Sequence, residues 1–208
     1  MKRLWAVVFA LMLLTGCGGQ QDRQPIMALR EQVMQAEQVT FSVDLTADYI
    51  DTVERFAMDC EVDETGTLRF TVTEPETIRG IAGEVSGSEG KLCFEDQALA
   101  FALMADDRLS PVSGPWLVMK ALRSGELVAI AEEGEEIRLT LNDSFEEDPL
   151  TADIWVSEDT VTAAEVAWRG RRVLSMEIED FEIRENCGER LHRIKRLYTV
   201  YFLCGVGQ

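Results

Sequence analysis

Residues 39–72 read VTFSVDLTADYIDTVERFAMDCEVDETGTLRFTV. Apolar and polar residues alternate along much of this stretch, which is the two-residue period of a β-strand with one solvent-facing side. The alternation is interrupted at Asp63-Glu64-Thr65-Gly66, residue types that favour a turn. The stretch therefore predicts one strand followed by a β-hairpin. The apolar positions that carry the period are Phe41, Val43, Leu45, Ala47, Tyr49, Phe56, Met58, Cys60, Val62, Leu68, Phe70 and Val72.

The strand pattern continues toward the C-terminus. Short apolar segments recur, and turn residues such as those of 86–90 and 132–135 separate them. Successive short strands joined by tight turns indicate an up-and-down antiparallel sheet, which has to curl and cover its apolar face. The further segments expected to be extended are 78–85, 91–95, 98–105, 127–131, 137–141, 152–157, 162–168 and 172–183.

Two segments depart from this pattern and predict helices. Residues 25–38 place apolar side chains at helical spacing, with polar side chains on the other side. In residues 110–125, Pro115 favours a helix start and Gly125 a helix end, and the positions between them are mostly apolar. We therefore predict an α+β, mainly β fold, in which a curled antiparallel sheet or half-barrel wraps over an N-terminal helix and a short central helix.

The N-terminus has the pattern of a bacterial lipoprotein signal peptide. Lys2 and Arg3 precede an apolar run from Leu4 to Leu14, which is too short to cross the ~30 Å hydrocarbon core of a bilayer as a helix. The run ends in Leu14-Thr15-Gly16-Cys17, which resembles the lipobox. We expect residues 1–16 to be removed, Cys17 to be lipidated, and residues 17–24 to form a tether. An ordinary signal peptide with an incidental cysteine is the alternative.

Composition narrows the range of functions. The chain has 208 residues with 20 Lys+Arg against 38 Asp+Glu, a formal net charge of -18. This size predicts one globular domain, here residues 25–183. The acidic excess repels phosphate backbones, so we expect no nucleic-acid partner. Residues 184–208 change character, since they are first basic and then apolar, and we expect them to form a further strand, to dock on the acidic body or to touch a membrane.

No residue pattern indicates catalysis or a cofactor. The single histidine, His192, lies in the basic tail, which disfavours Ser/His or Cys/His catalysis. Asp59, Glu61 and Asp63 alternate like calcium ligands, but no glycine stands where the loop would have to bend. The acidic loop 142–148 is a candidate for a weak cation site. We predict a protein that is not an enzyme, with no cofactor and no metal.

Four cysteines besides Cys17 leave the disulfide state open. Cys60, Cys93, Cys187 and Cys204 permit three pairings, and free thiols are the alternative. Because these cysteines lie far apart in the sequence, they do not predict a zinc site.

The order of elements resembles a known family. A helix and a strand meander lead to Gly66-Thr67-Leu68-Arg69-Phe70 and then Glu74-Pro75, followed by the Pro115-led helix and by closing strands with Arg169-Gly170-Arg171-Arg172-Val173-Leu174. Over residues 26–183 this order resembles the LolA/LolB-type outer-membrane lipoprotein carrier and receptor proteins and their lipoprotein relatives. The resemblance implies an incomplete antiparallel barrel that wraps over helices and encloses an apolar cavity for acyl chains.

These observations lead to one hypothesis and one alternative. The hypothesis is an extracytoplasmic lipoprotein, anchored to the cell membrane through Cys17, that binds or shields a lipid or other hydrophobic ligand in a half-barrel cavity. The alternative is an envelope structural or interaction lipoprotein whose core is filled and which docks a protein partner. The cavity candidates, which would otherwise fill the core, are Phe101, Leu103, Met104, Trp116, Leu117, Met119 and Leu122.

Overall fold

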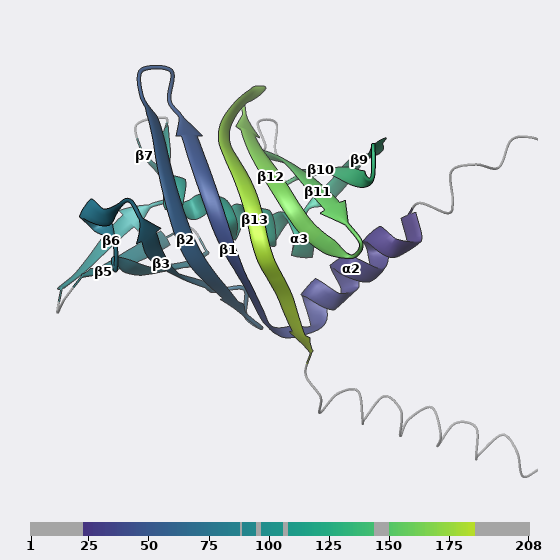
Figure 1. Cartoon of the computed structure of the whole chain (residues 1–208), viewed down its shortest axis with the longest axis horizontal. Helices are drawn as coiled ribbons and strands as arrows, with labels where there is room; N and C mark the ends of the chain where they lie inside the picture. Colours follow the sequence, from purple (N-terminus) through teal and green to yellow (C-terminus); the bar gives the residue numbers. More distant parts are fainter. Residues whose placement is uncertain (1–22, 88, 95–96, 106–107, 144–149, 186–208) are drawn as a thin grey trace, which may run out of the picture.

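The computed structural model describes residues 23–87, 89–94, 97–105, 108–143 and 150–185 (Figure 1). The predicted signal peptide, Cys17, most of the tether and nearly all of the C-terminal tail lie outside these residues. Within them, a helix, a long meander of strands and a second helix follow one another in the predicted order.

One antiparallel sheet of eleven strands dominates the fold, in the order β6-β5-β4-β3-β2-β1-β13-β12-β11-β10-β9. The sheet is curled but open, because its edge strands β6 and β9 are not paired with each other. The first and last strands, β1 and β13, are neighbours at its centre. This confirms the predicted mainly β, half-barrel fold class. The strands are β1 (Ala36–Asp48), β2 (Val53–Asp63), β3 (Leu68–Glu74), β4 (Ala82–Ser86), β5 (Glu89–Phe94), β6 (Gln97–Ala102), β9 (Glu126–Glu133), β10 (Glu136–Asn142), β11 (Thr151–Ser157), β12 (Thr160–Trp168) and β13 (Arg171–Glu185).

Two predicted strands are shorter in the structure than in the prediction. In the segment 78–85, Pro75 introduces a short 3-10 helix, η1 (Glu76–Ile78), and Gly80 then reverses the chain at φ +86° before β4 begins. In the segment 98–105, the chain leaves the large sheet after β6. It continues as β7 (Met104–Ala105), which pairs with β8 (Arg108–Leu109) in a separate two-stranded sheet.

The N-terminal helix α2 spans Arg23–Gln35 and ends three residues earlier than predicted. It ends there because Ala36 already pairs with Glu185 as the first residue of β1. Its apolar side faces the curl of the sheet, as the helical spacing predicts. The residues that bury this side are Ile26, Leu29 and Val33.

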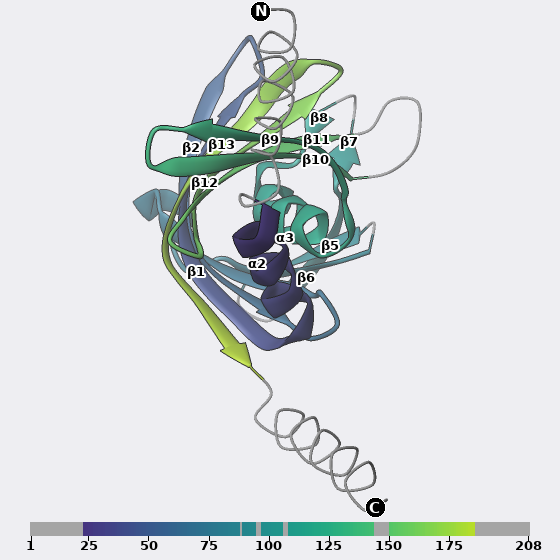
Figure 2. The ribbon, with the colours of Figure 1, turned by 90° about the vertical axis from the view of Figure 1, so that its right-hand side faces the viewer.

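The central helix α3 (Gly114–Ser124) follows a 3-10 turn, η2 (Pro111–Ser113), and lies inside the curl. Figure 2 shows α2 and α3 surrounded by the strands, with the β9–β10 hairpin on one side and β5–β6 on the other. Gly114 lets the helix start close to the sheet, since a Cβ there would lie 2.9 Å from Leu174 Cδ1 and 3.1 Å from Leu45 Cδ1. As predicted, α3 is buried on nearly all sides.

Side chains of α2 and of α3 itself fix the position of α3. Arg30 on α2 donates from Nε to the Leu122 carbonyl and from Nη2 to the Gly125 carbonyl, both at 2.8 Å. These bonds satisfy carbonyls that the end of a helix leaves without a partner. At the other side, Trp116 Nε1 donates to the Gly66 carbonyl at 3.1 Å, and Arg123 donates to the carbonyls of the same β2–β3 turn.

Candidate functional site

The seven predicted cavity residues come together in one apolar cluster inside the curl. Four of them lie on α3 and are buried: Trp116 and Leu117 are 7% and 4% exposed, and Met119 and Leu122 are 2% and 0% exposed. Around them, Ser113 is the one buried polar residue in the described part of the chain. The interior is therefore almost entirely apolar, which is the environment that an acyl chain requires.

The other three predicted residues, Phe101, Leu103 and Met104, lie at the margin of this cluster and are half-buried. Phe101 has a structural task there, because its ring covers Gly90 on the neighbouring strand, where a Cβ would lie 2.1 Å from Phe101 Cζ. All seven residues pack in or against the apolar core, so core packing is the role that their contacts show. The assignment of the seven residues to a ligand cavity stays a prediction.

The two edges of the half-barrel carry apolar side chains that the sequence analysis did not single out. On the edge strand β9, Leu127 and Ile130 pack against the core but are only partly buried. Their cross-strand partners Leu141 and Leu139 are fully buried, so these two side chains face the curl. Leu99 on β6 is 66% exposed. The apolar interior thus continues to the open side of the sheet, and the apolar run 127–131 was the signal that could have indicated this.

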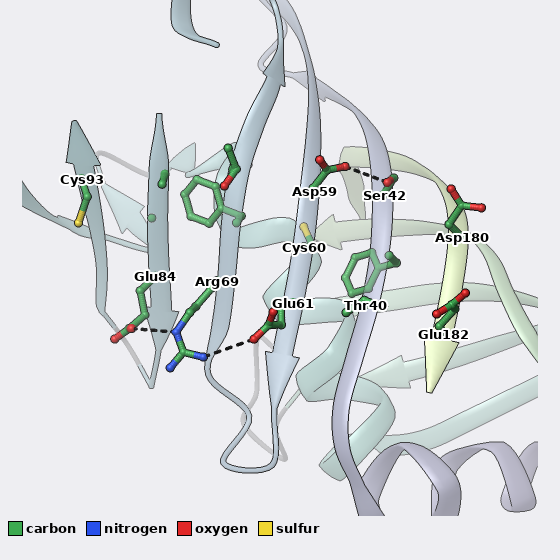
Figure 3. A pocket seen from close by; sticks show the side chains of 15 residues that line it. Thr40, Ser42, Asp59, Cys60, Glu61, Arg69, Glu84, Cys93, Asp180 and Glu182 are labelled. Atoms are coloured by element: carbon green, nitrogen blue, oxygen red, sulfur yellow. Dashed lines mark hydrogen bonds and ion pairs between the residues drawn. The ribbon is translucent and has the colours of Figure 1, made fainter. Parts of the chain in front are cut away.

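A separate groove of about 800 Å³ crosses the outer face of the sheet (Figure 3). Its bottom follows a cross-strand row of mostly small side chains, in which Ser42 pairs with Asp59, Asp59 with Thr71, Thr71 with Ala82, and Ala82 with Cys93. Because most of these side chains are small, they leave the space between the longer side chains around them unfilled. The lining residues are Thr40, Phe41, Ser42, Asp59, Cys60, Glu61, Arg69, Phe70, Thr71, Ala82, Gly83, Glu84, Cys93, Asp180 and Glu182.

The charges of this outer groove are mainly negative. Arg69 lies between Glu61, at 3.8 Å from Nη1, and Glu84, at 3.7 Å from Nε. Asp59 accepts a hydrogen bond from Ser42 Oγ at 2.9 Å. Asp180 lies at a bulge of β13 with φ +52°, a conformation that Asp tolerates better than most residues. Figure 3 shows these carboxylates along the groove, with Asp180 and Glu182 at one end and Cys93 at the other.

The two described cysteines are free and differ in reactivity. Cys60 is 4% exposed, and desolvation by burial, together with the charge of Asp59, raises the pKa of its thiol. Because the thiolate is the reactive form, Cys60 is inert at neutral pH. Cys93 is exposed at the end of the outer groove. Cys187 and Cys204 lie outside the described residues, as does His192.

The candidate cation ligands have other partners. Asp63 Oδ1 accepts hydrogen bonds from the backbone N–H groups of Thr65 and Thr67, and Glu61 lies beside Arg69. In the acidic loop, Asp143 pairs with Lys120 at 3.2 Å, and residues 144–149 are outside the description. Over the described ranges, no three His, Cys, Asp or Glu side chains are grouped so that they could hold a metal ion.

Comparisons with known proteins found similar solved structures at low sequence identity. No protein-family model matches the sequence, and no curated protein matches it. Among solved structures, a LolA superfamily protein from Nitrosomonas europaea is 11% identical with a TM-score of 0.43, and covers 79% of this chain and 96% of that one.

Two other solved structures are similar to the chain. An uncharacterized conserved protein from Thermus thermophilus is 11% identical with a TM-score of 0.45, and covers 83% of this chain and 93% of that one. The lipoprotein LppX from Mycobacterium tuberculosis is 12% identical with a TM-score of 0.33, and covers 74% and 95%. At such identities and TM-scores, what this chain binds has to be inferred from its own residues.

Among the helices of the described ranges, none has the length and apolar character needed to span a bilayer.

Proposed function

We propose that this chain is an extracytoplasmic lipoprotein whose half-barrel binds a lipid or another hydrophobic ligand between the sheet and its two helices. The observation that carries the proposal is the apolar interior that reaches the open side of the sheet. Leu127 and Ile130 on one edge, and Phe101 and Leu103 toward the other, are apolar side chains that the fold covers only partly.

Burial of an acyl chain against these side chains is favourable. Each methylene that leaves water contributes about 0.8 kcal/mol, and an apolar wall without buried charge imposes no desolvation cost on it. Met104 and Met119 add side chains with several rotatable bonds, which adapt to ligands of different shape. A ligand would enter at the open side, where it would cover the half-buried residues of the edge strands.

The anchor and the division of the chain belong to the same proposal. Lipidation of Cys17 after removal of residues 1–16 would place the half-barrel next to its source of lipid, because only residues 18–22 separate Cys17 from Arg23, the first residue of helix α2. Two or three acyl chains hold a protein at a membrane far more firmly than one chain does. On this proposal the domain 25–183 works on the extracytoplasmic face, β13 extends it to Glu185, and residues 186–208 follow as the tail.

Native mass spectrometry with lipid extraction tests the binding proposal. A soluble form that begins at Gly18 would be purified without detergent, alone and with Ile130→Glu, which puts a charge on the inner side of β9. Ala131→Glu is the matched control, because Ala131 pairs with Arg138 on the outer side of the same strand. We expect co-purified lipid of defined mass in the parent and in Ala131→Glu, and its loss in Ile130→Glu.

A clean apo mass for the parent, with no uptake of added fatty acid or phospholipid, would overturn the proposal. That result would favour the alternative, a lipoprotein with a filled core that docks a protein partner. Equal lipid content in the two variants would show that the ligand lies elsewhere than the open side.

A further inference from the structure

We propose that the C-terminal tail, residues 186–208, folds back across the sheet and occupies the outer groove. The proposal concerns the outer face and does not depend on the binding of a lipid inside the curl. Its starting point is the position of the groove, which begins where the described chain ends. Asp180 and Glu182, at one end of the groove, stand just before Glu185, the last residue of β13.

The tail has the length that the groove requires. From Asp180 on β13 to Cys93 on β5, the groove crosses five strand-to-strand spacings, or about 24 Å at 4.7–4.9 Å each. An extended chain covers this distance with about seven residues, at 3.3–3.6 Å per residue. The sequence beyond Glu185 continues to Gln208 and is more than long enough to turn and to cross the groove.

The charges of the groove and of the tail are complementary. Five carboxylates line the groove against the single guanidinium of Arg69. In the described part of the chain, no cation forms an ion pair with Asp180 or Glu182. The tail carries the basic residues that would neutralise this end of the groove, and they come soon after Glu185. They are Arg190, Arg193, Lys195 and Arg196.

The apolar part of the tail follows its basic part in the order that the groove requires. Residues 197–203 read LYTVYFL, without a charge and with strong β-propensity. Beyond the carboxylates of β13, the groove passes over the small side chains of Ser42, Thr71 and Ala82, which leave room for larger side chains. Basic residues would therefore lie near β13, and the uncharged segment after them would cross this row of small side chains.

Cysteine cross-linking tests this position directly. Cys204 lies far enough along the tail to reach Cys93, whereas Cys187 lies two residues beyond Glu185 and reaches only ~7 Å, well short of the ~24 Å to Cys93. The full chain in mild detergent would be oxidised with diamide, which takes two electrons and two protons from two thiols as they form a disulfide. We expect peptide mass spectrometry to find Cys93 linked to Cys204 within one chain, and no such link in Cys93→Ser.

Reversing the charge of the tail distinguishes a tail that occupies the groove from thiols that meet only by chance. Replacing the four basic residues, Arg190, Arg193, Lys195 and Arg196, by Glu should raise the rate at which a bulky maleimide labels Cys93 about fivefold, which corresponds to about 1 kcal/mol of lost attraction. Adding Asp59→Lys and Glu182→Lys to that variant should restore the slow rate. Restoration shows that the variant tail and the variant groove are both intact.

Three results would overturn the proposal. The first is a Cys93 labelling rate that does not change with the charge of the tail. The second is a disulfide that forms only between two chains, which would assign the groove to the tail of a second copy. The third is oxidation that leaves Cys93 unlinked while Cys187 and Cys204 pair with each other.

Discussion

Leu174 and Ser175 are neighbours on β13 and point to opposite faces of the sheet. Leu174 is fully buried inside the curl and lies against the start of α3, whereas Ser175 is half-buried on the outer face, where it pairs with Thr46 and Glu165. The inner face of the described sheet is closely packed and apolar, and the outer face carries small and charged residues around a groove. The comparison shows that the two faces divide the work: the inner face stabilises the fold, and the outer face is free to carry charge.

We expect the largest change in the free energy of unfolding from a substitution on the inner face of β13. Leu174→Ala should lower the free energy of unfolding by about 2–5 kcal/mol, because it leaves a cavity that the surrounding strands fill only partly. Ser175→Ala, one residue away, should change it by less than about 0.5 kcal/mol. Urea unfolding followed by circular dichroism measures both. Similar losses in the two variants would mean that the outer face contributes as much to the fold as the inner face.

A second test concerns the margin of the inner face, where Phe101 covers Gly90. Gly90→Ala should destabilise the protein by about 1–3 kcal/mol, because the added methyl group overlaps the Phe101 ring. In the Phe101→Leu background the same substitution should cost much less, because all three of the nearest atoms belong to that ring. A double-mutant cycle of unfolding free energies measures the difference. Additive losses would show that the cost of Gly90→Ala does not come from the Phe101 ring.

Local patterns predicted much of the fold. The two-residue period of 39–72 indicated β1, β2 and β3 together with their turn, and the Pro115–Gly125 segment indicated α3 and its burial. Both signals work because the inner face excludes water, so apolar residues recur with the period of the local structure. The seven candidate residues were chosen from the sequence for their apolar side chains. They lie in one cluster because the apolar residues of a small domain share one core.

The outer groove and the anchors of α3 could not be predicted in this way. The groove depends on the cross-strand register that aligns Ser42, Thr71 and Ala82, residues that lie far apart in the sequence. The anchors join Arg30 to Leu122 and Trp116 to Gly66, across 92 and 50 residues. Register and long-range hydrogen bonds follow from the assembled sheet, and no local period reports them.

A third test concerns the hydrogen bonds that Arg30 donates to the end of α3 inside the curl. Arg30→Met keeps the aliphatic stem of the side chain but removes both hydrogen bonds to the helix end, so it should cost about 1–2 kcal/mol. Arg30→Lys, which keeps the charge and one donor, should lose less. Thermal unfolding measures both variants. If Arg30→Met unfolds at the parent temperature, packing alone holds α2 and α3 in the curl.

The smallest expected effect lies on the outer face, at Asp63. Partial burial raises the pKa of this carboxyl, but hydrogen bonds from Thr65 and Thr67 and the charge of Arg69 outweigh it, so the pKa lies below its ordinary value. A carboxyl whose folded pKa is lowered stabilises the protein above its unfolded pKa of about 4, and this contribution is lost as the pH falls through the folded pKa.

The side chain of Asp63 keeps 25% of its surface in contact with solvent, which screens its charge, so its contribution should be below about 1 kcal/mol. Asp63→Asn should therefore be slightly less stable than the parent at pH 6, and the difference should shrink as the pH falls from 6 toward 2.5. Paired urea titrations at several pH values measure this difference. A difference that stays constant with pH would mean that the amide preserves the turn and that the charge of Asp63 stabilises nothing. The charge of Asp63 would then not affect the free energy of unfolding. If the same holds for the other carboxylates of the outer face, they can bind a partner such as the tail without a loss of stability.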